Sequence, residues 1–95
     1  FQSNHEGKII DEIHNSLNCS GIVINPGAFT HYSYAIRDAI ESVEIPTAEV
    51  HLSDINNRED FRKKSVIKEV CIGQISGLGK VGYLNAVKMI IDYKN

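Results

Sequence analysis

Apolar residues recur along the chain with helical spacing in some segments and as short continuous runs in others, so helices and strands should alternate. Apolar residues at helical spacing predict helices at residues 5–18, 31–43 and 80–93, and a short helical piece is expected at 58–64. The apolar runs between them predict strands at residues 21–25, 48–52 and 69–75. Such alternation favours right-handed crossovers and a parallel sheet. We therefore expect an α/β, flavodoxin-like parallel sheet with helices on both faces.

The helical periodicity also predicts which side chains face the sheet. The inward-facing set comprises Ile9, Ile10, Ile13, Leu17, Ala35, Ala39, Ile40, Val43, Leu84, Val87, Ile90 and Ile91. No repeat, low-complexity stretch or linker divides the 95 residues. A chain of this length forms one domain at most, so we treat 1–95 as a single domain with one modest core.

Polar residues follow the apolar bodies of two predicted strands. The first strand ends at Asn25-Pro26-Gly27, and the second ends at His51-Leu52-Ser53. In a doubly wound sheet, ligands bind beyond the carboxyl ends of the strands. These two tips are therefore the predicted location of a binding site.

His51 follows Glu49 at the spacing of two residues that places both side chains on the same face of a strand. A carboxylate beside an imidazole stabilises the imidazolium and fixes its tautomer, as a proton donor near neutral pH requires. A histidine held by Glu49 for purely structural reasons gives the same pattern. Position alone favours neither interpretation.

Other polar residues near the tips have weaker patterns. Asn25 opens a turn, which is its simpler interpretation, although such a turn can also cradle a hydroxylated or anionic ligand. His31 opens the second expected helix, where backbone N–H groups favour an anion, and Asp38 lies about two turns further on the same face. Arg58 and Arg62 share a face of the short helical piece, and either can clamp a carboxylate. Solvated surface residues would show the same patterns.

Composition and charge argue against several classes of protein. Apolar residues make up 42% and charged residues 23%, as in an ordinary soluble domain. The net charge of −2 and the lack of a basic block argue against nucleic-acid or membrane partners, and no apolar run approaches the ~20 residues of a membrane span. The histidines and cysteines lack the paired spacing of a metal site. Cys19 and Cys71 are expected to be buried thiols of a reducing compartment.

The segment Gly77-Leu78-Gly79-Lys80-Val81-Gly82 matches the G-x-G-x-x-G pattern of dinucleotide-binding proteins. It belongs to the last βα unit, and the acidic residue expected ~20 positions downstream has no place before Asn95. A tight turn and close helix packing explain the glycines better. A nucleotide-binding domain is therefore the weakest functional hypothesis, and no cofactor is expected.

Taken together, several of these segments closely resemble the type II 3-dehydroquinate dehydratases. The resemblance runs over the whole length, in order, through Phe1–Gly7, Ile24–His31, Ser33, Arg37–Ala39, Glu49–Ser53, Arg58–Arg62 and Gly73–Gly79. It implies a cytoplasmic lyase of the shikimate pathway of aromatic amino acid biosynthesis. Such an enzyme dehydrates 3-dehydroquinate to 3-dehydroshikimate through an enolate, without a metal or a Schiff base. The resemblance also implies a homo-oligomer, a dodecamer built of trimers.

The resemblance assigns roles to the residues at the strand tips. His51 would be the general acid that protonates the leaving hydroxyl, oriented by Glu49. Asn25 would contact the substrate and the water that stabilises the enolate. The remaining implied contacts are those of His31, Asp38 and Arg62 with substrate hydroxyls and those of Leu52 and Ser53 with the carboxylate.

The resemblance further implies a segment that these residues lack. In the family, a central strand with a Gly-Pro-Asn turn comes first, followed by a mobile lid that carries an arginine and the tyrosine base. None of the tyrosines of this sequence matches the position of that base; they are Tyr32, Tyr34, Tyr83 and Tyr93. We therefore expect the C-terminal portion of a longer protein, inactive as a fragment, with the further strand between Phe1–Asn4 and residues 21–25. The alternative is a non-catalytic binding or assembly module derived from the same family.

Overall fold

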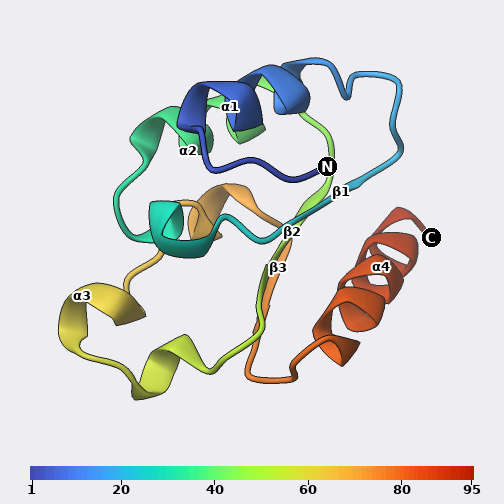
Figure 1. Ribbon diagram of the computed structural model, residues 1–95. Coiled ribbons are helices and arrows are strands. Elements are labelled where there is room, and N and C mark those ends of the chain that lie inside the picture. The colour runs from blue at the N-terminus through green and yellow to red at the C-terminus, as the bar shows by residue number, and fades with distance from the viewer.

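In the computed structural model, residues 1–95 form three parallel strands with helices on both faces of the sheet (Figure 1). The strands are β1 (Ile22–Ile24), β2 (Thr47–His51) and β3 (Gly73–Ser76), in the order β1-β2-β3. The α-helices are α1 (Glu6–His14), α2 (Tyr34–Val43), α3 (Asp60–Lys63) and α4 (Val81–Lys94). Three connections contain the 3-10 helices η1 (Gly27–His31), η2 (Ile55–Asn57) and η3 (Lys68–Val70). This architecture confirms the predicted fold class.

The central strand β2 pairs in parallel with both neighbours. Ile24 of β1 lies opposite Glu49, and His51 lies opposite Ser76 of β3. All five residues of β2 are buried, as expected for a strand covered on both faces. Because the strands are parallel, their carboxyl ends lie at one edge of the sheet, and this edge carries the predicted tips.

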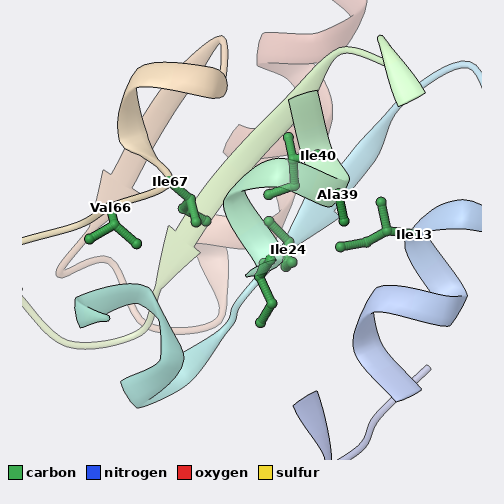
Figure 2. Packing of buried hydrophobic residues seen from close by; sticks show 7 residues of the cluster. Ile13, Ile24, Ala39, Ile40, Val66 and Ile67 are labelled. Atoms are coloured by element: carbon green, nitrogen blue, oxygen red, sulfur yellow. The ribbon is translucent and has the colours of Figure 1, made fainter. Parts of the chain in front are cut away.

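Buried apolar side chains form one cluster on each side of the sheet. The cluster beneath α1 and α2 joins Ile13 of α1, Ile24 of β1 and Ile40 of α2, and the segment at 66–67 closes it from the side (Figure 2). The second cluster packs α4 against β2, and it consists of Ala48, Val50, Ala86 and Ile90. The side chains of Glu49 and His51 alternate with those of Ala48 and Val50, so they point away from α4.

The first helix is shorter than predicted. It ends at His14, after which the backbone changes to tighter turns in which Ser16 N–H donates to the Ile13 carbonyl and Cys19 N–H donates to the Ser16 carbonyl. Leu17 therefore lies outside the helix and is 66% exposed, so its predicted inward position is wrong.

The predicted helix at 31–43 is two separate helices. His31 ends η1, and α2 begins at Tyr34 after Ser33, whose hydroxyl accepts a 3.0 Å hydrogen bond from Ile36 N–H. This is the usual capping arrangement for a serine before a helix. The two-turn spacing that placed His31 and Asp38 on one helical face therefore does not apply.

Four other side chains predicted to face inward are exposed, namely Ala35, Leu84, Val87 and Ile91. The sheet-facing side of α4 consists of Gly82 and Ala86 together with Ile90, whose predicted inward position is confirmed. A Cβ on Gly82 would be in ordinary van der Waals contact with the Val50 side chain at 3.4 Å, so only a small residue fits between α4 and β2 at their present separation. The hydrophobic periodicity pointed to the larger residues, whereas close packing selected the small ones.

The glycine-rich turn after β3 has the role expected from its position. Gly77 has φ +82° and Gly79 has φ +58°, and both values are unfavourable for other residues. The Gly79 N–H donates to the Leu52 carbonyl at 3.0 Å, which ties this turn to the tip of β2. β3 begins at Gly73 rather than at residue 69 because 68–70 forms η3.

A groove of about 550 Å³ is lined by Phe1–Ser3, by residues of α1 and by β1, with Asn25 and Tyr83 among its walls. β1 is an edge strand of the sheet and has β2 as its one strand neighbour. The groove therefore lies where the resemblance places a further strand. None of the helices has both the length and the apolar character needed to cross a membrane.

The two cysteines differ in environment, and the prediction that both are buried is wrong for Cys19, which is exposed. Burial, followed by the negative charge of Glu49, raises the pKa of the Cys71 thiol to about 12. Because the thiolate is the reactive form, we expect a thiol reagent at neutral pH to modify Cys19 and to spare Cys71 until the protein unfolds. Peptide mapping after timed labelling checks this, and equal labelling of both residues would contradict it.

Candidate active site

The pair of His51 and Glu49 lies at the carboxyl end of β2, on the face away from α4. His51 Nε2 lies 2.5 Å from Glu49 Oε2, and the two residues are 5% and 0% exposed. Period-two spacing along the strand brings the two groups together, as predicted. The contact fixes the ring, because Nε2–H donates to the carboxylate in either protonation state of the imidazole.

The second ring nitrogen of His51, Nδ1, makes no hydrogen bond within the protein. Every fully buried side-chain nitrogen or oxygen in the chain has a partner, so Nδ1 must reach the surface. A protonated imidazole held in this way presents one N–H to a ligand while Glu49 holds the other. That is the geometry of a proton donor at the edge of the sheet.

Glu49 receives more hydrogen bonds than His51 alone supplies. Thr30 Oγ1 donates to Glu49 Oε2 at 2.6 Å, and Ser65 Oγ lies 2.9 and 2.8 Å from the two carboxylate oxygens. Burial disfavours the charged form, but hydrogen bonds from His51, Thr30, Ser65 and Gln74 outweigh it and lower the pKa of Glu49. Glu49 is therefore an anion at neutral pH despite its burial.

Asn25 directly follows β1, and both ends of its amide are held. Its Nδ2 donates to the Tyr83 hydroxyl at 3.1 Å, and its Oδ1 accepts from the Gly27 N–H at 3.1 Å. Gly27 has φ +59°, which a glycine adopts without strain. Asn25 therefore does belong to a turn, which was its simpler interpretation. Its exposed amide also keeps one N–H for a ligand.

His31 and Arg62 lie on two segments that contact each other. His31 Nδ1 lies 2.7 Å from the Lys64 carbonyl, and its ring packs edge-on against Phe61 with centroids 6.4 Å apart. The guanidinium of Arg62 lies over the same Phe61 ring at 4.7 Å and pairs with Glu59. Phe61 thus connects the two predicted substrate-binding residues.

Ser53 is exposed just beyond β2, and its hydroxyl accepts a 2.6 Å hydrogen bond from Arg58 Nη2. Arg58 caps η2 and lies before α3, so the prediction that Arg58 and Arg62 share a helical face is wrong. A guanidinium beside a hydroxyl provides donors suited to a carboxylate. Leu52 is also exposed at this tip, and its carbonyl accepts the hydrogen bond from Gly79 N–H.

The structure does not connect Asp38 with the other predicted residues. Asp38 is exposed on α2 and takes part in no side-chain hydrogen bond or ion pair. No hydrogen bond or ion pair joins Asn25, His31, His51 and Arg62 to one another either, but all of them lie in or after segments that leave the carboxyl edge of the sheet. No group of three or more metal-ligating side chains occurs in the chain.

Sequence reasoning missed three residues that contact the predicted site, Thr30, Ser65 and Tyr83. Thr30 is 19 residues from Glu49, Ser65 is 16 residues from it, and Tyr83 is 58 residues from Asn25. No local spacing predicts such contacts. The one available signal was that Thr30 directly precedes the predicted site residue His31.

Comparisons with known proteins identify the family of the chain. Residues 1–91 match the profile of the family described as dehydroquinase class II. A 3-dehydroquinate dehydratase of Thermotoga maritima is 66% identical over 90 residues, which are 95% of this chain and 62% of the relative. A 3-dehydroquinate dehydratase of Caldicellulosiruptor saccharolyticus is 64% identical over 89 residues, 92% of this chain and 61% of the relative.

Solved structures give the same result. The type II dehydroquinase of Butyrivibrio crossotus superposes with a TM-score of 0.91 at 57% identity, over 95% of this chain and 64% of that one. The corresponding protein of Propionibacterium acnes gives 0.88 at 38% identity, over 97% and 65%. The chain thus spans somewhat under two thirds of the length of these relatives. With its parallel sheet, its buried histidine–glutamate pair and a profile match over nearly all its length, the chain belongs to the type II dehydroquinase family.

Proposed function

We propose that this chain supplies the acid half of a 3-dehydroquinate dehydratase active site. The observation that carries the proposal is His51, whose ring is fixed by an ionised, buried Glu49 through Nε2 while Nδ1 remains accessible. The family membership and the names of the relatives supply the reaction class. The geometry supplies a residue able to perform one of its steps.

In the proposed reaction, a base removes a proton from the carbon beside the substrate ketone, and the electron pair moves onto oxygen to form an enolate. The enolate then re-forms the ketone as the carbon–carbon double bond forms and the carbon–oxygen bond of the leaving hydroxyl breaks. His51 Nδ1–H gives its proton to that hydroxyl, which departs as water. Glu49 stabilises the imidazolium before this transfer and retains Nε2–H after it.

The other residues at the edge bind and orient the substrate in this proposal. The free N–H of Asn25 points to a bound water or the enolate oxygen, and Ser53 with the Leu52 backbone receives the carboxylate. Arg58 adds positive charge beside Ser53. His31 and Arg62 contact ring hydroxyls, and Asp38 does so from its exposed position on α2.

In this proposal the catalytic base lies outside these 95 residues. The resemblance places it on a lid that follows a further strand, and the groove beside β1 is the position available for that strand. We therefore propose that the reaction requires the whole protein that carries this chain, in the cytoplasm and as a homo-oligomer. The 95 residues alone should not convert the substrate.

Adding 3-dehydroquinate to the whole protein tests the proposal. We expect an absorbance increase from the conjugated enone of 3-dehydroshikimate, and no such increase with the isolated chain. Calorimetric titration of both forms with a cyclohexane carboxylic acid that carries hydroxyls provides the comparison. Binding by the whole protein without turnover would favour the alternative, a non-catalytic binding module derived from this family.

A further inference from the structure

Two hydroxyl side chains, those of Thr30 and Ser65, donate hydrogen bonds to the carboxylate of Glu49. Thr30 is fully buried and donates to Oε2 at 2.6 Å. Ser65 is partly buried and reaches both carboxylate oxygens, at 2.9 and 2.8 Å. Neither residue takes part in the proposed proton transfer itself.

Each hydroxyl has a single hydrogen, so a hydroxyl that donates to Glu49 does not donate to the other hydroxyl. Thr30 and Ser65 lie 3.1 Å apart, so either could donate to the other. An ionised carboxylate has no hydrogen of its own, and it is the stronger acceptor, so both hydroxyls point their hydrogens at Glu49. The carboxylate then accepts from Thr30, Ser65 and His51 on three different segments, in addition to the interaction with Gln74 that helps to lower its pKa.

The segment that carries Ser65 is itself fastened to η1. Val66 N–H donates to the Thr30 carbonyl at 2.8 Å, and His31 Nδ1 lies 2.7 Å from the Lys64 carbonyl. Contacts on both sides of Ser65 therefore hold its hydroxyl in place, and they hold it relative to Thr30. This arrangement leaves Glu49 one orientation, the one in which Oε2 faces the His51 ring.

We propose that Thr30 and Ser65 are positioning residues that hold the Glu49 carboxylate in the orientation that presents His51 Nδ1 to the substrate. This inference rests on the proposed function, because presenting His51 matters only if His51 transfers a proton. Thr30 is fully buried, so it acts through Glu49 and makes no contact with the substrate. Loss of either hydroxyl should lower kcat and leave KM nearly unchanged.

Three variants of the whole protein test the inference, Thr30→Val, Thr30→Ser and Ser65→Ala. Thr30→Val keeps the shape and removes the hydroxyl, whereas Thr30→Ser keeps the hydroxyl. Since hydrogen bonds to charged groups are among the stronger ones, we expect kcat to fall roughly 10-fold in Thr30→Val and Ser65→Ala. Thr30→Ser should retain most of the activity. Ser42→Ala is the control, because it removes a serine hydroxyl that donates to the Ala39 carbonyl within α2 and makes no contact with Glu49.

The pH profile separates positioning from a general loss of structure. Removing a donor from ionised Glu49 raises its pKa toward that of an ordinary buried carboxyl, so the acid limb of kcat should move to higher pH in Thr30→Val and Ser65→Ala. It should not move in Ser42→Ala. If Thr30→Val does not fold, Ser65→Ala carries the same comparison.

A readout independent of turnover keeps this inference distinct from the proposed function. The side-chain carboxyl carbon of Glu49, followed by carbon-13 NMR, should titrate at higher pH in both hydroxyl-free variants than in the unsubstituted protein. If the unsubstituted protein does not convert 3-dehydroquinate, the proposed function fails, and the NMR titration still decides whether the hydroxyls hold Glu49. An unchanged titration, or a larger KM with unchanged kcat, would overturn the positioning role.

Discussion

Replacing His51 with alanine in the whole protein should lower kcat for 3-dehydroquinate dehydration by ~10²–10⁴-fold, the usual cost of losing a general acid. The reason is that no other side chain places an N–H at the end of β2 with a buried carboxylate behind it. Steady-state kinetics on purified protein measures the effect. KM should change far less than kcat, because the proton transfer occurs after binding.

His14→Ala is the matched control for this substitution. His14 is exposed on the last turn of α1, far along the chain from the strand tips, so its removal should leave kcat unchanged. Added imidazole should restore part of the activity of His51→Ala, since it can occupy the vacated space and donate a proton. A loss confined to KM, or an equal loss in both variants, would show that His51 is structural.

Replacing Glu49 with alanine should destabilise the protein by about 3 kcal/mol, because a buried charge partner is lost and several donors remain without an acceptor. The donors are His51 Nε2–H and the hydroxyls of Thr30 and Ser65. Urea unfolding of the whole protein measures the change. Glu49→Gln is the matched variant, since it keeps the volume and one acceptor oxygen but not the charge, and it should lose less.

The pH dependence of stability provides a second check on Glu49. Its pKa in the folded protein is lowered, so the stabilisation it contributes is fully present above the unfolded pKa of ~4.3 and is lost as the pH falls through the lower folded value. Glu49→Gln should lack this component of the acid-side loss. Identical pH profiles for the two proteins would mean that Glu49 is not held as an anion.

The fold was largely predictable because strands and turns depend mainly on residues that are close together in the sequence. Burial on both faces of β2 follows from its position in the middle of a parallel sheet, and the glycines at 77 and 79 fit a turn that needs positive φ. Helix boundaries were less predictable. The side chain of Ser33 caps α2, so the helix begins at Tyr34 and the segment before it forms η1. The single helix expected at 31–43 is therefore divided.

The inward face of α4 shows a second limit of periodicity. Leu84, Val87 and Ile91 fit a helical stripe, yet the sheet is approached through Gly82 and Ala86. Whether a large or a small residue faces the sheet depends on how closely two elements approach, which is a property of the packed structure. Sequence spacing does not contain that distance.

The candidate site was predictable only where its residues are close in sequence. Glu49 and His51 are two residues apart on one strand, so their contact follows from strand geometry. The hydroxyls that hold Glu49 come from η1 and from the segment after α3, and only the folded chain brings them together. The roles of Asn25, His31, Asp38, Leu52, Ser53 and Arg62 in binding stay predictions.

The most direct test is a crystal structure of the whole protein with a bound cyclohexane carboxylic acid that carries ring hydroxyls. We predict that the ligand occupies the carboxyl edge of the sheet, with a ring hydroxyl within hydrogen-bonding distance of His51 Nδ1 and the carboxylate at Ser53. Asn25 and Arg62 should contact the same molecule. A ligand bound elsewhere, with His51 Nδ1 turned away from it, would contradict the proposed site and the proposed function together.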